Sequence, residues 1–120
     1  MELYESSEDY LETILVLKNR LGVVRSIDIA RELNYSKPSV SVAMKKLKAN
    51  GYINVLDDGT IELTEAGYTI ASKTYEKHQM LVNAFIKLGV SEETAKEDAC
   101  KIEHHLSEET FEAIKKFLNK

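Results

Sequence analysis

The segment from residue 26 to residue 63 restricts what this chain can fold into more than any other part. Its first half predicts two short helices, Ile27–Leu33 opened by Ser26 and a second one from about residue 36 to Asn50. Proline is tolerated only in the first turn of a helix, so Pro38 marks where the second helix starts. Two short helices joined by a tight turn predict a helix-turn-helix.

Two β-rich runs follow the second helix, Tyr52–Leu56 and Thr60–Leu63. They flank Asp57-Asp58-Gly59, and Asp-Gly between such runs predicts a tight hairpin in which both turn residues have positive φ. The hairpin makes the predicted motif a winged helix-turn-helix. The two aspartates make the tip of the wing acidic, which does not favour contact with DNA phosphates.

Basic charge is confined to the same region. The whole chain has a formal charge of −4, whereas residues 25–50 carry +4, from six basic and two acidic side chains. Helical periodicity predicts that the second helix buries one apolar stripe, formed by Val40, Ala43, Met44 and Leu47.

The opposite face of this helix carries small polar and lysine side chains. Short hydroxyl side chains let a helix approach base edges, and lysines neutralise phosphates. We therefore expect double-stranded DNA as a partner, although a solvated basic helix face is the simpler alternative. The residues expected to contact DNA are Ser36, Lys37, Pro38, Ser39, Ser41, Val42, Lys45 and Lys46.

Four further helices are predicted from apolar periodicity and from the residues at their ends. In chain order they run from a cap at Ser6 or Ser7 to Leu21, from Glu65 to Leu88 between Thr64 and Gly89, from Glu92 to His105, and from Glu108 to Asn119. The apolar stripe of the long helix needs a partner, either the following helices or a second chain. The expected fold class is mainly α with a small β-hairpin wing.

The sequence Cys100-Lys101-Ile102-Glu103-His104-His105 places three metal-binding side chains on one turn of a predicted helix. Cys100, Glu103 and His104 stand at i, i+3 and i+4, so they share one face. This set suits a divalent transition metal, but one helical turn cannot enclose an ion, so further ligands must come from elsewhere. In the alternative interpretation the two histidines are partly buried, Cys100 packs as a small apolar residue, and Glu103 is solvated.

Several segments follow one another in a recognisable order along the chain. They are Ser7-Glu8-Asp9-Tyr10-Leu11-Glu12, Ile27-Asp28-Ile29-Ala30, Ser36-Lys37-Pro38-Ser39-Val40-Ser41, Leu63-Thr64-Glu65-Ala66-Gly67, Lys77-His78 and the segment from Cys100 to His105. Each is weak alone, but all of them in order are specific. From about Ser6 to Leu118 the chain resembles the diphtheria toxin repressor family of metal-dependent transcription regulators. In length it is closest to the short branch of that family, the manganese transport regulators.

The resemblance implies a set of metal ligands: Asp9, Glu12, His78, Cys100, Glu103 and His104. It allows one ion or two ions per subunit. In the two-metal form Glu103 is the bridge, with Asp9, Cys100 and His104 on one ion and Glu12 and His78 on the other. His105 is expected to point aside.

The identity of the metal depends on ligands that match different branches of the family. Asp9 and Glu12 match the manganese branch, whereas the cysteine at Cys100 matches the iron-sensing branch. Carboxylate oxygens favour Mn(II), and a thiolate favours Fe(II) and softer ions. The expected cofactor is therefore Mn(II) or Fe(II). From the residues alone, ordinary roles are favoured over metal binding: Asp9 as a capping acid, Glu12 as an exposed side chain and His78 as a packed core histidine.

The resemblance also implies a function. It is that of a homodimeric repressor that binds operator DNA when loaded with metal and controls genes of metal-ion homeostasis. Residues 1–72 would form the DNA-binding domain, and residues 73–120 the helical metal-binding and dimerisation domain. Two alternatives are a metal-independent winged-helix regulator and a small metalloenzyme with Glu103 as general base. We expect no enzyme, since the sequence contains no catalytic motif and the enzyme alternative leaves the basic segment without a role.

Composition and the N-terminus indicate where the chain works. No apolar run approaches the roughly 18 residues needed to span a bilayer, and the segment from Met1 to Glu5 lacks the basic and apolar regions of a signal peptide. The single cysteine cannot form an internal disulfide, which fits a reducing compartment. The expected location is the cytoplasm, with no membrane partner.

Overall fold

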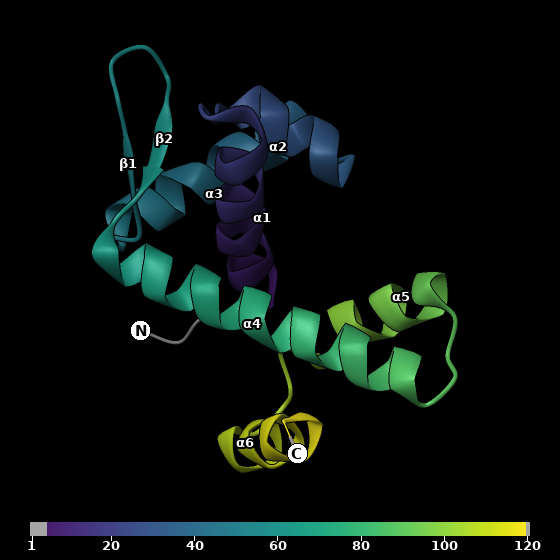
Figure 1. Cartoon of the computed structure of the whole chain (residues 1–120). Helices are drawn as coiled ribbons and strands as arrows, with labels where there is room; N and C mark the ends of the chain where they lie inside the picture. The colour runs from purple at the N-terminus through teal and green to yellow at the C-terminus, as the bar shows by residue number, and fades with distance from the viewer. Residues whose placement is uncertain (1–4, 120) are drawn as a thin grey trace. The chain divides into compact units, whose positions relative to one another are not determined.

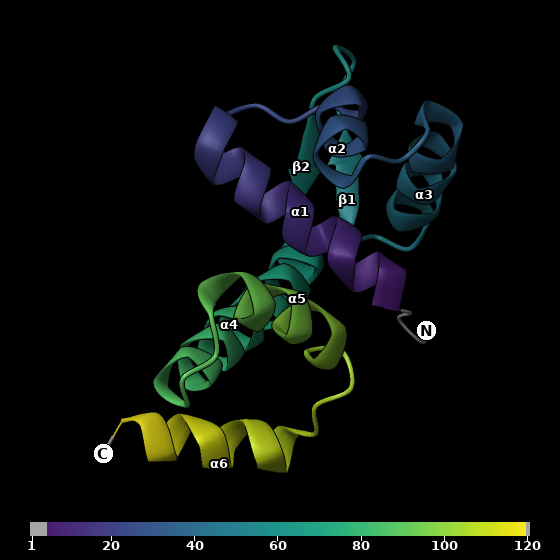
Figure 2. The ribbon, with the colours of Figure 1, turned by 90° about the vertical axis from the view of Figure 1, so that its right-hand side faces the viewer.

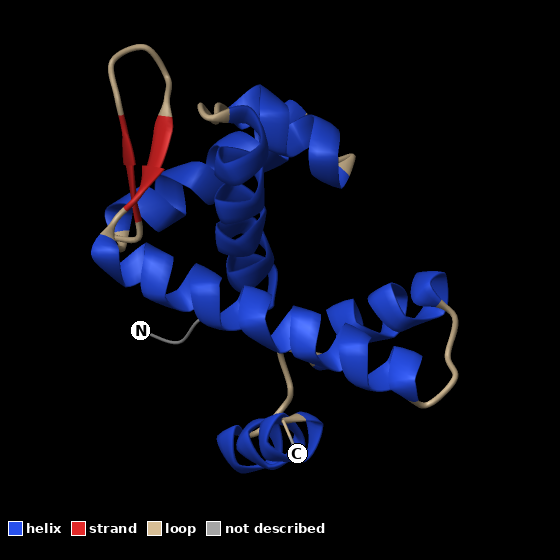
Figure 3. Ribbon diagram, viewed as in Figure 1, coloured by secondary structure: helices blue, strands red, loops and turns tan. Residues whose placement is uncertain are grey.

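The computed structural model of the chain describes residues 5–119 (Figure 1). In chain order its elements are α1 (Glu5–Leu21), α2 (Ser26–Leu33), α3 (Lys37–Ala49), β1 (Ile53–Val55), β2 (Ile61–Leu63), α4 (Glu65–Lys87), α5 (Glu92–Ile102) and α6 (Glu108–Leu118). Helices predominate and the two strands form one sheet (Figure 3), so the expected fold class is confirmed. Residues 1–4, part of the segment in which no signal peptide is expected, lie outside the described residues.

The described chain divides into two compact units, the first ending at Ser72 and the second beginning at Lys73. The first unit is built around one apolar core. Leu11, Ile14 and Leu17 of α1 recur every three residues and are at most 2% exposed, as expected for a helix with one face on a core. Residues of α2, α3 and the two strands, together with Val24 and Ala71, complete this core. Figure 2 shows these three helices together with the hairpin.

The turn between α2 and α3 is fixed by the residues at the two helix ends. Asn34 ends α2 in the left-handed conformation, with φ of 57°, which asparagine adopts more readily than most residues with a side chain. Ser36 caps α3, because its Oγ accepts a hydrogen bond from the backbone N–H of Ser39 at 3.2 Å. Pro38 lies in the first turn, as predicted.

In contrast to the start of α3, the predicted starts of α1 and α2 are wrong. Ser6 and Ser7 lie inside α1 and do not cap it. Ser26, expected just before its helix, is the first residue of α2, and Arg25 takes the cap position. The backbone N–H of Arg25 donates to Oδ2 of Asp28 at 2.9 Å, so a carboxylate three residues ahead satisfies the helix end instead of a serine hydroxyl.

The hairpin forms as predicted, but its turn differs. β1 and β2 pair antiparallel in the register Ile53–Leu63, Asn54–Glu62 and Val55–Ile61. Among the turn residues 57–59, only Gly59 has a positive φ, of 88°, whereas two such residues were expected. Gly59 donates its N–H to the carbonyl of Leu56, and Leu56 donates to the carbonyl of Thr60, each at 2.9 Å. The loop therefore has three residues and ends in a left-handed glycine, a common alternative to the two-residue turn.

α4 has the start and end that its flanking residues predict, to within one residue. Oγ1 of Thr64 accepts a hydrogen bond from the N–H of Gly67 at 3.1 Å, and Gly89 follows the helix with φ of 101°. α4 is 23 residues long. Neither it nor any other helix within residues 5–119 is both long and apolar enough to span a membrane.

The second unit packs the later part of α4 with α5 and α6 around a smaller core. The buried members of this core are Met80, Leu81, Ala99 and Phe111. Two ion pairs join α4 to α6, Lys73 with Glu108 and Glu76 with Lys115, each at 2.8 Å. Because exposed ion pairs contribute about 1 kcal/mol or less, apolar contact is the main attachment of α6.

α5 ends earlier than predicted, at Ile102 instead of His105. Glu103 is its C-cap and keeps helical dihedral angles, φ of −56° and ψ of −29°, with its N–H donating to the carbonyl of Ala99. The N–H of His105 then bonds to the carbonyl of Ile102, three residues back, which tightens the chain into a turn. The helical spacing of Cys100 and Glu103 is therefore kept, whereas His104 lies in the turn after the helix.

Candidate metal centre and DNA-reading helix

Glu103 carries a carboxylate that is almost fully buried. The residue is 1% exposed, although it lies at the end of a helix. A buried carboxylate destabilises a fold unless hydrogen bonds or positive charges surround it. The partners of Glu103 therefore indicate what the position does.

The two carboxylate oxygens of Glu103 differ in their surroundings. His78, on α4, donates a hydrogen bond from Nδ1 to Oε2 at 2.8 Å. Within residues 5–119, Oε1 accepts no hydrogen bond. Nε2 of His104 lies 3.5 Å from Oε1, which is long for a hydrogen bond. A buried acceptor without a hydrogen bond is an atom able to bind a cation.

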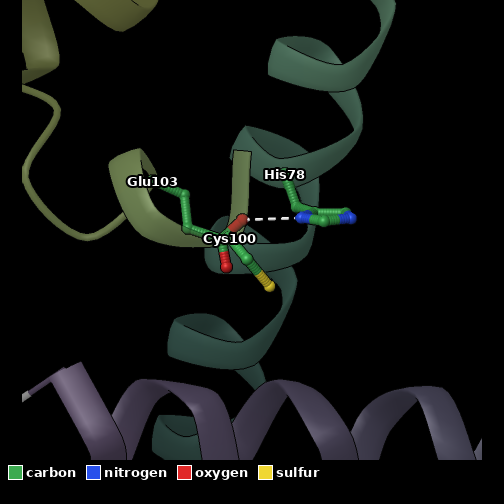
Figure 4. A group of neighbouring side chains, drawn as sticks. All are labelled: His78, Cys100 and Glu103. Atoms are coloured by element: carbon green, nitrogen blue, oxygen red, sulfur yellow. Dashed lines mark hydrogen bonds and ion pairs between the residues drawn. The ribbon is translucent and has the colours of Figure 1, made fainter. Parts of the chain in front are cut away.

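Cys100 adds a third donor to this pair. A ring nitrogen of His78, Sγ of Cys100 and a carboxylate oxygen of Glu103 lie within 4.8 Å of one another. Figure 4 shows the three side chains converging, with His78 on one helix and the other two at the end of the next. The sequence-based division of a two-metal site, with Cys100 and His78 on different ions, does not follow from this grouping.

The distances within this cluster of His78, Cys100 and Glu103 suit a metal ion. Ligands bound to one transition metal at about 2.0–2.3 Å are separated by at most about 4.6 Å, and the three donors all lie within 4.8 Å of one another. Nitrogen, sulfur and oxygen donors together suit a divalent transition metal better than a hard ion that takes only oxygen. The residues present therefore fit a divalent transition metal.

The alternative interpretation of the segment from Cys100 to His105, as ordinary packing, is wrong for two of its residues. It expects Glu103 to be solvated and Cys100 to be packed in the core. Instead, Glu103 is buried and Cys100 is exposed. A thiol in contact with solvent beside a buried carboxylate has little packing role.

The remaining sequence-predicted ligands lie on two elements. Asp9 and Glu12 are three residues apart on α1, in the first unit, and both are half-buried. Their spacing puts them on one face of α1. In the second unit the imidazole of His104 is 2% exposed, whereas His105 is exposed.

The exposed face of α3 contains the residues expected to read DNA. The buried stripe of this helix is Val40, Met44 and Leu47, with Ala43 half-buried beside it. All the residues expected to contact DNA are exposed, namely Ser36, Lys37, Pro38, Ser39, Ser41, Val42, Lys45 and Lys46. Apart from Pro38 and Val42, the exposed face of the helix is polar and basic.

Sequence reasoning missed a contact that holds the wing. Arg25, before α2, donates from Nε to the carbonyl of Asp58 at 3.3 Å, and its guanidinium lies 3.6 Å from the Asp58 carboxylate. The pKa of Asp58 lies below its ordinary value of 3.8. The largest cause is the hydrogen bond from the backbone N–H of Thr60, and the Thr60 side chain and the Arg25 charge lower the pKa further. The acidic wing tip is thus partly neutralised from within the unit. The only sequence signal was a basic and an acidic residue 33 positions apart, which no local pattern connects.

Comparison with known families covers nearly the whole chain. A family profile described as "Iron dependent repressor, N-terminal DNA binding domain" matches residues 2–61. A second, described as "Iron dependent repressor, metal binding and dimerisation domain", matches residues 64–120. The chain belongs to the iron-dependent repressor family. This is the family of metal-dependent transcription regulators that the sequence resembles, and the chain has both of its characteristic domains.

Individual members of the iron-dependent repressor family are similar over most of this chain. The transcriptional regulator MntR of Escherichia coli is 38% identical over 97% of the chain, which covers 75% of that protein. The iron-dependent repressor IdeR of Mycobacterium tuberculosis is 31% identical over 98% of the chain, which covers 52% of that protein.

A solved structure extends the similarity to the fold. The structure of the manganese regulator SloR matches with a TM-score of 0.82 and 32% identity, over 94% of this chain and 53% of that one. The chain thus spans about half the length of SloR. The name of SloR includes manganese and the name of IdeR includes iron, and these are the two metals expected from the ligands.

Proposed function

We propose that this chain is a metal-dependent transcriptional repressor that binds operator DNA when loaded with Mn(II) or Fe(II). The observation that carries the proposal is the buried carboxylate of Glu103, whose Oε1 accepts no hydrogen bond from residues 5–119 and which lies beside His78 and Cys100. The family membership of the chain supports the same conclusion.

The proposed metal ligands are the six residues implied by the resemblance: Asp9, Glu12, His78, Cys100, Glu103 and His104. A bound divalent ion would supply the positive charge that balances the buried carboxylate. His78 orients Glu103 through the hydrogen bond to Oε2, and that leaves Oε1 available. The number of ions per subunit is one or two, and Glu103 is the residue that both would share.

The proposed metal preference follows from the donor atoms. Carboxylates at Asp9, Glu12 and Glu103 favour Mn(II), and the thiolate of Cys100 favours Fe(II). The thiol is exposed, so an ion reaches it without any rearrangement of the core. Cys100 is therefore the residue that most directly sets the order of metal affinities.

The proposed DNA contacts lie on α3 and at its N-terminal cap. Lys37, Lys45 and Lys46 neutralise phosphates, and the small side chains of Ser39 and Ser41 let the helix approach the bases. In a homodimer, two copies of α3 read half-sites about one helical turn of DNA apart. The family's second domain is described as a dimerisation domain, which supports the homodimer.

The division of labour follows the two units. Residues 1–72 are proposed to bind DNA, and residues 73–120 to bind metal and form the dimer. A repressor of this kind acts in the cytoplasm, where operators are accessible. Control of metal-ion homeostasis genes follows from its response to metal, and no enzymatic role is proposed.

The proposal is tested by measuring DNA affinity with and without metal. The probe is a duplex containing the DNA upstream of the protein's own gene, and binding is followed by fluorescence anisotropy. We expect Mn(II) or Fe(II) to tighten binding by 5- to 150-fold, the range that corresponds to about 1–3 kcal/mol of coupling. Binding of equal strength in excess chelator would contradict the proposal and support a metal-independent regulator.

A further inference from the structure

Val42 is an apolar residue at the centre of the exposed face of α3. It is 54% exposed, the largest exposed fraction among the large apolar residues of that helix. Its neighbours one turn away in either direction are Pro38, Ser39, Lys45 and Lys46, and all of them are exposed. An apolar side chain thus lies within an otherwise polar and basic surface.

The position of Val42 relative to the core excludes a packing role within the first unit. The buried residues Val40 and Met44 stand two positions before and two positions after it. Each residue turns an α-helix by about 100°, so Val42 is rotated by about 200° from both. The side chain therefore points directly away from the core.

The neighbouring serines are partly engaged in the helix cap. Oγ of Ser36 accepts from the N–H of Ser39 and donates to Oγ of Ser39 at 2.9 Å. Val42 follows this cap within the first two turns of α3, and in helix-turn-helix proteins it is the N-terminal part of the recognition helix that meets base edges. Val42 is therefore placed to meet a base edge.

The chemistry of valine restricts which base it recognises. Its side chain has neither a donor nor an acceptor, so it cannot satisfy the polar groups that guanine, cytosine and adenine present in the major groove. Thymine alone presents a methyl group there. On the basis of the proposed function, we propose that Val42 contacts the C5 methyl group of a thymine in each operator half-site and so selects T·A at that position.

Replacement of thymine by uracil tests this directly, because it removes only the methyl group. The probe is a duplex selected from a randomised pool by the Mn(II)-loaded full chain, and each thymine is then replaced in turn by uracil. One position per half-site should lose about four-fold in affinity, the value for one buried methyl group. With Val42→Ala, binding to the thymine duplex should weaken and the uracil penalty at that position should disappear.

Two further variants make the result specific to Val42. Val42→Thr keeps the shape and one methyl group, so it should retain part of the uracil penalty. Val23 is also an exposed valine, 45% exposed, but it lies outside α3. Val23→Ala should therefore leave the loss of affinity caused by uracil unchanged. Circular dichroism checks that each variant is folded.

The possible outcomes separate this inference from the proposed function. A uracil penalty that persists at full size in Val42→Ala would overturn the inference, as would the absence of a penalty at every thymine. Failure of the wild-type chain to select any duplex in the presence of metal would instead contradict the proposed function.

Discussion

At the scale of single residues, the energetics of Glu103 are the clearest guide to function. An unsatisfied buried acceptor destabilises a fold by about 1–3 kcal/mol, and more when it is charged. His78 satisfies one oxygen only, since Oε1 receives no hydrogen bond from residues 5–119. A residue chosen for stability alone would be apolar or better paired, so the carboxylate is expected to gain its full stabilisation from a bound cation.

We predict that Glu103→Gln abolishes the stabilisation of the chain by metal. Glutamine keeps the size and one acceptor oxygen for His78, but it replaces the other oxygen by an NH2 donor and removes the charge that a cation requires. Ligand binding at about 100 times its dissociation constant stabilises a native state by about 2.7 kcal/mol. Thermal unfolding with and without Mn(II) should show a clear increase in Tm for the wild type and none for the variant.

His105→Ala is the matched control for this measurement. His105 is exposed and lies two residues from Glu103 in the same turn, and the resemblance gives it no ligand role. It should retain the increase in Tm on addition of Mn(II). Equal responses of the two variants would show that the ligand assignment is wrong.

The sequence predicted that Cys100 and Glu103 share one face, but it did not predict their environments. Helical spacing brought Cys100 and Glu103 to one face, and the structure has them in one cluster with His78. The burial of Glu103 depends on packing between helices that are distant in sequence, which no local pattern reports. The same limit explains why the contact between Arg25 and Asp58 was missed.

At the scale of elements, the start of α4 is fixed to the hairpin by a close backbone approach. The carbonyl of Tyr52 accepts a hydrogen bond from the N–H of Thr64 at 3.1 Å. Gly67 lies against the same carbonyl, and a Cβ added at Gly67 would collide with it. Only glycine allows the helix to begin this close to the strand.

We therefore predict that Gly67→Ala destabilises the chain. The gain in helix propensity is about 1 kcal/mol, but overpacking against a backbone atom that cannot move aside costs about 1–3 kcal/mol or more. Urea denaturation should show a lower free energy of unfolding. Thr69→Ala, at an exposed position of the same helix, should be close to neutral. A Gly67→Ala variant as stable as the wild type would mean that the approach of Tyr52 is not required.

Helix ends with a serine or threonine cap were the most predictable elements. Ser36, Ser91 and Ser107 each accept the backbone hydrogen bond expected of a cap. The errors were at ends that tertiary contacts or other residues determine: the start of α2, where Asp28 replaces a serine, and the end of α5, where the side chain of Glu103 is buried. The prediction of a two-residue turn in the wing was wrong because Asp-Gly is also compatible with a three-residue loop.

At the scale of the whole molecule, the proposed function requires that the binding of metal and the binding of DNA are coupled. The DNA-binding domain of the family matches residues 2–61, and the metal-binding and dimerisation domain matches residues 64–120. The proposed ligands Asp9 and Glu12 belong to the first domain, and the other four to the second. We propose that metal binding changes DNA affinity, and linkage then requires DNA to change metal affinity by the same factor.

This reciprocity is the most direct test of the proposal that metal binding controls DNA binding. Isothermal titration calorimetry would measure the affinity of the full chain for Mn(II), and separately for Fe(II) without oxygen, in the absence and presence of a saturating operator duplex. We expect the duplex to tighten metal binding by the same factor, 5- to 150-fold, by which metal tightens DNA binding. A metal affinity that is unchanged by the operator would contradict it.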